Sequence, residues 1–310
     1  KEEENTSAAL VRGVAAKIAE LGYTLSGFDA CATSTVLSGS GLSSSAAYET
    51  LVGSIFNHFC CGGKLDAVTI AKIGQYAENV YFGKPCGLMD QMGSSVGGAV
   101  AIDFNDPADP VVERVDYDFT RSGHVLCIVD TGSSHGDLTD DYAAVTREMG
   151  AVSAYFGKKF LRDVPEQHFR AAIPALRREC GDRAVLRSLH FYSDDRRAVQ
   201  EAEALKAGEF DRFLTLVNAS GKSSSLLLQN TWSISDPKQQ AVPLALAVAE
   251  ELLDGAGAVR VHGGGFAGTI QAFVPEDRLS LFKSGMEALL GAGKCHILHI
   301  RPQGGCVVAE

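Results

Sequence analysis

Apolar residues recur every three or four positions along much of the chain, and this spacing predicts amphipathic helices. The first begins at Thr6, where a polar side chain can cap it, and Gly22 can end it. The predicted helices cover residues 6–21, 44–60, 65–81, 138–152 and most of 155–255. The long helical stretch between 155 and 255 indicates a bundle-like region in the second half of the chain.

Runs rich in Val, Thr and other strand-forming residues lie between these helices and predict strands. The first two, 24–28 and 30–36, suit a hairpin. Further strands are predicted over 98–104, 111–115, 124–130, 257–262, 268–274, 295–301 and 305–309, with a helix over 276–291. This order is typical of an antiparallel α+β fold. We place the domain boundary near residue 122, which gives domains 1–122 and 123–310.

The charge balance narrows the range of partners. The chain has 28 Lys and Arg against 38 Asp and Glu, a formal charge of −10, and no block of five or more basic residues. Nucleic acid and anionic membranes would be repelled, so we expect neither as a partner. No apolar run reaches the ~18 residues of a membrane span. The eight cysteines contain no C-x-x-C pair. We therefore expect a cytoplasmic protein with reduced thiols.

Glycine and serine concentrate in SGSGLSSSAA, residues 38–47, between an extended run and a helix. Glycines let the backbone approach a ligand closely, and a helix N-terminus offers unpaired N–H groups to an anion. The segment therefore predicts a phosphate-binding loop. It is not a dinucleotide fingerprint, because Ser44 stands where the third glycine is needed. The alternative is an ordinary helix cap with a flexible lead-in.

Two further segments could carry chemistry. GKPCGLMDQ, residues 83–91, places Asp90 just past a Gly-Pro turn, and Glu78 lies twelve residues before it. A carboxylate here could accept a proton or hold Mg²⁺, or it could simply cap a helix or lie in solvent. RVHGGGFAG, residues 260–268, lies between two predicted strands. It could be a plain hairpin turn or a second backbone wall close to phosphates.

In this order, the three segments resemble the signatures of the GHMP small-molecule kinases, and within them the galactokinases. The family's G-x-G-L-S-S-S-A is matched from Gly39 to Ala46. Its G-x-P-C-G-[IL]-M-D-Q is matched without exception by residues 83–91, and its G-G-G-F-G-G is matched by 263–268 with Ala267 as the one change. The resemblance extends over essentially the whole chain.

The resemblance implies a two-domain α+β fold. Its N-terminal mixed α/β domain would lack its first strands here, and its C-terminal domain would be ferredoxin-like with a helical insertion. It also implies an enzyme that uses ATP and Mg²⁺ to phosphorylate the C1 hydroxyl of galactose. We expect a monomer whose partners are ATP and a small-molecule sugar.

The resemblance also implies a role for individual residues. Asp90 would be the catalytic carboxylate beside the anomeric hydroxyl, and Gly87, Asp90 and Tyr142 would contact the sugar. Glu78, with a hydroxyl of Ser44 or Ser45, would hold Mg²⁺. The residues implied to bind the ATP phosphates are Gly39, Gly41, Leu42, Ser43, Ser44, Ser45, Ala46, Gly264 and Gly265.

Three departures from the family pattern leave alternatives open. The N-terminal signature G-R-V-N-L-I-G-E-H-T-D-Y does not occur, and the chain opens at Lys1, so we expect the complete protein to have residues upstream. The family's Y-N-x-R-R reads YAAVTR over 142–147, and its S-H-x-S-L reads SGKSS over 220–224. These changes leave open that the substrate is another sugar, such as N-acetylgalactosamine or a pentose. A non-catalytic galactose and ATP sensor is the alternative from another class.

Overall fold

The computed structural model describes residues 4–36, 42–106, 109–133 and 138–308, so Gly39 and Gly41 lie outside the described residues. The chain forms two compact units. The first unit comprises the described residues up to Tyr117 together with those from Ile300 on, and the second runs from Asp118 to His299. Each unit has its own core.

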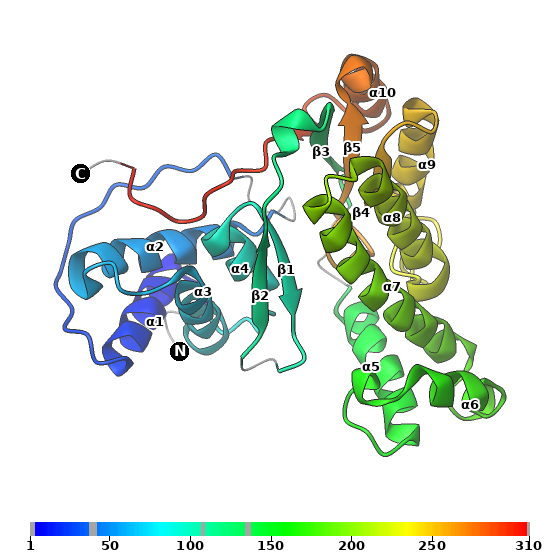
Figure 1. The fold of residues 1–310 in the computed structure, drawn as a ribbon, viewed down its shortest axis with the longest axis horizontal. Helices are drawn as coiled ribbons and strands as arrows, with labels where there is room; N and C mark the ends of the chain where they lie inside the picture. The colour runs from blue at the N-terminus through cyan, green and yellow to red at the C-terminus, as the bar shows by residue number, and fades with distance from the viewer. Residues whose placement is uncertain (1–3, 37–41, 107–108, 134–137, 309–310) are drawn as a thin grey trace. The chain divides into compact units, whose positions relative to one another are not determined.

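Helices dominate the first unit (Figure 1). Its elements are α1 (Ser7–Glu20), α2 (Ser44–Cys61), α3 (Ala67–Tyr76), the π-helical turn η1 (Ala77–Phe82), α4 (Met89–Val96), β1 (Ala99–Asp103) and β2 (Val111–Val115). The Thr6 hydroxyl caps α1 by accepting a hydrogen bond from the Ala9 N–H at 3.2 Å. Apolar faces of α1, α2 and α3 meet in a core that includes Val14, Ile18 and Phe56. β1 and β2 confirm the strands predicted at 98–104 and 111–115, and they pair in antiparallel fashion.

The second unit is built on an antiparallel sheet. Among its described residues the strands β3 (His124–Asp130), β4 (Ala258–Val261), β5 (Thr269–Pro275) and β6 (Cys295–Leu298) pair in the order β4-β5-β3-β6. β3 and β5 occupy the centre, which is the ferredoxin-like arrangement expected for this part of the chain. The helices α9 (Ala241–Leu253) and α10 (Leu279–Leu290) bury Ala245, Phe282 and Met286 against it.

A helical insertion connects β3 to β4. It comprises α5 (Thr139–Tyr155), α6 (Glu166–Glu179), α7 (Asp182–Lys206), α8 (Phe210–Ser223) and the π-helical turn η4 (Ser224–Leu228), followed by α9. Figure 1 shows these helices in green to yellow. Around Phe169, Leu176 and Tyr192, α6 and α7 form a separate small core. The helical reading of 155–255 is therefore confirmed.

Three of the predicted strands are absent from the described residues. Residues 24–28 and 30–36 form no hairpin but run as extended, largely exposed chain, and the described residues provide no strand to pair with them. The predicted strand at 305–309 is also absent as far as residue 308. Here the backbone packs closely on helices instead: a Cβ added to Gly305 would lie 2.8 Å from the Thr50 side chain on α2.

The last residues of the chain also differ from the expected division at 122, which placed all of 123–310 in the second domain. From Ile300 on, the chain belongs to the first unit. The Gly98 N–H donates to the Arg301 carbonyl at 2.8 Å, and the Arg114 guanidinium donates to the Pro302 carbonyl at 2.7 Å. Bonds between residues so far apart in sequence leave no local pattern from which they could be predicted.

Candidate active site

The N-terminus of α2 presents the serines of the glycine- and serine-rich segment. Ser43 precedes the helix in the left-handed conformation, with φ 50° and ψ 57°, and Ser44 and Ser45 are its first two residues. Ala46 behind them is fully buried. The first N–H groups of a helix have no partners within the helix, and its dipole favours negative charge there. Residues 42–46 therefore surround a helix end suited to an anion.

Asp90 lies at this helix end. It is the second residue of α4, whose first turn follows the GKPCG segment. Its side chain is exposed, and its Oδ2 accepts a hydrogen bond from the Ser43 hydroxyl. The structure thus brings together two residues that the sequence predicted from separate motifs. Gly87 lies three residues before Asp90 and is exposed, and a Cβ added to it would meet no atom within 4 Å.

Glu78 approaches the same helix end from η1, and its side chain is buried. Its Oε1 accepts a hydrogen bond from the Ser45 hydroxyl at 3.1 Å, and its Oε2 accepts one from the Gln91 amide at 2.9 Å. The hydroxyl that contacts Glu78 is thus that of Ser45. One end of α2 therefore touches an exposed carboxylate through Ser43 and a buried carboxylate through Ser45.

The oxygens of Glu78 and Ser45 fit Mg²⁺. This ion prefers oxygen ligands and is commonly held by one or two carboxylates together with substrate phosphates, not by a cage of protein side chains. The described part of the chain contains no cluster of three or more His, Cys, Asp or Glu arranged to hold a metal. A carboxylate and a hydroxyl therefore lie beside a helix end suited to an anion.

Glu49, on α2, forms a second buried carboxyl group that the motifs did not reveal. Its Oε2 accepts a hydrogen bond at 3.0 Å from the Gln91 Nε2 that also binds Glu78. Burial, followed by the charge of Glu78, raises the pKa of Glu49 to about 8, so this carboxyl keeps its proton at neutral pH. Gly74 leaves room for the cluster, because a Cβ there would lie 3.1 Å from Glu49 Oε2.

A signal for Glu49 does exist in the sequence. Ala46, Glu49, Thr50 and Gly53 recur at helical spacing on α2, and all of them are buried. An acidic residue on the inward face of a helix is uncommon without a partner. Cys86, in the adjacent turn, is less suited to chemistry, because burial raises the pKa of its thiol to about 12.

The glycine turn between β4 and β5 forms the candidate site of the second unit. Gly265 has φ +81°, and a Cβ there would collide with the Asn230 carbonyl, which also accepts the Phe266 N–H. The Asn230 amide donates to the Gly264 carbonyl at 3.0 Å. Only glycine fits at residue 265, for reasons of both conformation and space. Asn230 is a positioning residue that the motifs missed.

Tyr142, on α5, packs against the same turn. Its hydroxyl donates to the Gly265 carbonyl at 2.8 Å, and its ring lies edge-on to Phe266 at a centroid distance of 5.3 Å. A Cβ on Gly264 would come within 2.8 Å of the Tyr142 ring. Tyr142, Gly264 and Gly265, which the sequence singled out separately, therefore lie together.

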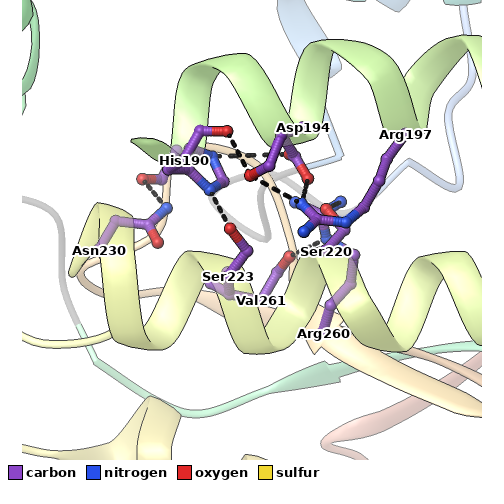
Figure 2. Close-up of polar contacts among 10 residues, drawn as sticks. His190, Asp194, Arg197, Ser220, Ser223, Asn230, Arg260 and Val261 are labelled. Carbon is purple, nitrogen blue, oxygen red and sulfur yellow. Dashed lines mark hydrogen bonds and ion pairs between the residues drawn. The ribbon is translucent and has the colours of Figure 1, made fainter. Parts of the chain in front are cut away.

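A buried polar network supports the strand that leads into this turn (Figure 2). Arg260, on β4, donates to the Ser220 hydroxyl of α8 at 2.7 Å. On α7, His190 forms a hydrogen bond through Nδ1 with Ser223 at 2.9 Å, and its Nε2 lies 3.6 Å from Asp194. Burial lowers the pKa of His190, which favours the neutral ring. The network ties α7 and α8 together and fixes α8 against β4.

The close packing of α8 on β4 explains a departure from the family pattern. Where S-H-x-S-L places a histidine, this chain has Gly221. A Cβ at that position would lie 2.9 Å from both the Arg260 Cβ and the Val259 carbonyl oxygen. Helix α8 approaches β4 too closely for any side chain there, so the substitution belongs to the packing of this interface.

Comparison with known proteins identifies the class and then the family. The model of the GHMP kinases N terminal domain matches residues 9–98, the region that carries the serines, Glu78 and Asp90. The chain is 34% identical to the galactokinase of Streptomyces coelicolor over 83% of its own length and 63% of that protein. It is 31% identical to the galactokinase of Glaesserella parasuis serovar 5 over 88% and 68%. The chain belongs to the galactokinase family of GHMP kinases, and it spans less than two thirds of the Streptomyces relative.

Solved structures agree on the fold. A crystal structure of Lactococcus lactis galactokinase complexed with galactose is similar, with a TM-score of 0.73 and 21% identity over 98% of this chain and 77% of that one. L. major mevalonate kinase in complex with R-mevalonate gives a TM-score of 0.58 at 14% identity over 96% and 78%. The predicted GHMP kinase fold is confirmed. Within the described residues, we find no helix with the length and apolar character of a membrane span.

Proposed function

We propose that the complete protein transfers the γ-phosphoryl group of ATP to the C1 hydroxyl of galactose. The observation that carries this proposal is the end of α2, where Ser43 binds Asp90 and Ser45 binds Glu78. A triphosphate at this helix end would have an exposed carboxylate near its acceptor side and a buried carboxylate near its metal side. The galactokinase relatives support galactose as the acceptor.

In the proposed reaction, the C1 oxygen of the sugar bonds to the γ-phosphorus while the bond from that phosphorus to the leaving ADP oxygen breaks. The hydroxyl proton must then leave. Asp90, exposed and held by the Ser43 hydroxyl, would orient the hydroxyl and accept this proton or stabilise its departure. Gly87, three residues before Asp90, would contact the sugar. Most of the catalysis would come from positioning and from neutralising phosphate charge.

Glu78 and Ser45 are the residues that would hold Mg²⁺ in this protein. When bound, the ion would neutralise charge on the β- and γ-phosphates. Gln91 would keep the Glu78 carboxylate in place from the opposite side, through its hydrogen bond to Oε2.

The eight cysteines are free, which supports a reducing compartment, the cytoplasm, as the site of action.

The test uses the complete protein. ADP release would be measured with Mg²⁺, ATP and each of three sugars: galactose, N-acetylgalactosamine and arabinose. We expect the highest kcat/KM on galactose, with the phosphate on C1 by ³¹P and ¹³C NMR. Faster turnover of another sugar would replace galactose as the substrate. Tight binding of galactose and ATP without ADP release would instead indicate a sensor.

A further inference from the structure

Lys84 occupies the variable position of the G-x-P-C-G signature, and its ammonium group lies at the candidate active site. Its Nζ is 3.6 Å from Glu78 Oε1. This is the same oxygen that accepts the Ser45 hydrogen bond at 3.1 Å. A positive charge therefore lies beside the N-terminus of α2, next to the carboxylate that is proposed to hold the metal.

The backbone of Lys84 is fixed while its side chain is accessible. The N–H groups of Gly83 and Lys84 both donate to the Glu78 carbonyl, at 3.0 and 3.1 Å, and Pro85 restricts the backbone conformation of Lys84, the residue before it. The Lys84 side chain is 66% exposed, whereas that of Glu78 is 3% exposed. The turn thus fixes the backbone of a long, flexible side chain that is largely exposed and whose ammonium group reaches a buried carboxylate.

This pair differs from an ordinary surface ion pair. An exposed pair contributes little because water screens both charges, and Lys72 with Asp109 in the same unit is an example, with the aspartate 86% exposed. Buried Glu78 needs a nearby cation, since a buried charge without a partner is costly. A metal ion that binds Glu78 would take over this task and release Lys84 for another anion.

The anion that fits is the terminal phosphate of a nucleotide. Glu78 and Asp90 place two carboxylates around the end of α2, and both would repel a triphosphate. Lysine is a common phosphate ligand because its ammonium group acts as a compact point charge. We propose that Lys84 contacts the terminal phosphate oxygens of bound ATP, and that it pairs with Glu78 when no nucleotide is bound. This assignment rests on the proposed function.

The experiment compares nucleotide binding by the complete protein and its Lys84→Met, Lys84→Arg and Lys72→Met variants. Calorimetry would give affinities for a non-hydrolysable ATP analogue with Mg²⁺, and for AMP, which lacks the two terminal phosphates. We expect Lys84→Met to weaken binding of the analogue about tenfold, or about 1.4 kcal/mol, and to leave AMP binding unchanged. Lys84→Arg should retain affinity within about threefold, because it keeps the charge. Lys72→Met should match the wild type.

Each outcome decides the assignment. Wild-type affinity for the analogue in Lys84→Met would overturn it and leave Lys84 as a partner of Glu78 alone. An equal loss for AMP and the analogue would also overturn it, because that pattern reports general disruption of the site. If the wild type binds neither nucleotide, the proposed kinase function fails too. If the wild type binds the analogue but phosphorylates no galactose, the proposed substrate fails, and the comparison of Lys84→Met with Lys72→Met still decides the role of Lys84.

Discussion

The candidate functional residues of the two units are of opposite kinds. The first unit uses charged and polar side chains: Glu49, Glu78 and Gln91 are buried together, and Asp90 is exposed at the end of α2. The second unit uses backbone, in a glycine turn that Tyr142 fixes through neutral hydrogen bonds and ring packing. The charge of a side chain can be changed without changing the fold, whereas a tightly packed turn has no space for an added atom. Substitutions of the exposed charged side chains in the first unit should therefore change activity with little change in stability. Substitutions in the glycine turn of the second unit should lower both.

The largest effect on activity is expected from Asp90→Asn. The amide keeps the size of the side chain but cannot accept the hydroxyl proton, so kcat should fall by about a thousandfold. The side chain is exposed, so the free energy of unfolding should change by less than about 1 kcal/mol. Steady-state kinetics and urea denaturation check both values. Asp109→Asn, an exposed aspartate of the same unit, is the matched control, and wild-type turnover by Asp90→Asn would refute the catalytic role.

Gly265→Ala should damage the second unit by packing. The new methyl group would meet the Asn230 carbonyl at a backbone φ of +81°. We expect a loss of about 2–4 kcal/mol of stability, measured by chemical denaturation, together with a loss of activity. Gly208→Ala is the control: its φ is also positive, but its Cβ would meet no atom within 4 Å, so it should lose only about 1–2 kcal/mol. Equal losses in the two variants would contradict the packing argument.

Glu49→Gln should change the pH dependence of stability in the metal-free protein. The pKa of Glu49 is raised from 4.5 in the unfolded chain to about 8 in the folded protein. At pH values between these two, the folded state holds a proton that the unfolded state has lost. The contribution of the Glu49 proton to the free energy of unfolding is therefore complete below pH 4.5 and is lost as the pH rises through 8. Its slope is at most about 1.4 kcal/mol per pH unit.

Gln mimics the neutral carboxyl group, so Glu49→Gln should remove this slope and retain most of the stability at pH 7. Urea denaturation from pH 5 to 9 measures the effect, with exposed Glu113→Gln as the control. An unchanged slope in Glu49→Gln would show that Glu49 is not the group responsible.

The smallest change is expected from Gly87→Ala. The position is open, since an added Cβ would touch nothing within 4 Å, and the stability should stay within about 0.5 kcal/mol of the wild type. If the sugar packs against this backbone, the methyl group will raise KM for galactose severalfold while KM for ATP stays the same. An unchanged KM for galactose would remove Gly87 from the sugar site.

The residues that lie within short motifs could be predicted from the sequence. Ser43, Ser45 and Asp90 lie where glycines, a helix start and a Gly-Pro turn follow one another, and each of these local features has a clear conformational meaning. Most helices and the strands of the second unit also followed from periodicity. The hairpin at 24–36 was wrong because strand-forming residues still need a partner strand, and periodicity does not reveal one.

The partners that complete the site were harder to predict. Glu49 meets Gln91 across 42 residues of sequence, and Asn230 meets Gly264 across 34. The contacts of the last segment with the first unit span even more of the chain, as Arg114 does with Pro302. Such pairs depend on how helices pack, and the local spacing of residues along the sequence does not predict this packing.

The most direct test is a crystal structure of the complete protein with galactose, Mg²⁺ and a non-hydrolysable ATP analogue. Our account predicts the γ-phosphate at the N-terminus of α2, in contact with Ser45 and near Glu78, and the C1 hydroxyl of the sugar hydrogen-bonded to Asp90. A nucleotide bound away from this helix end, or a sugar whose C1 hydroxyl does not reach Asp90, would contradict it.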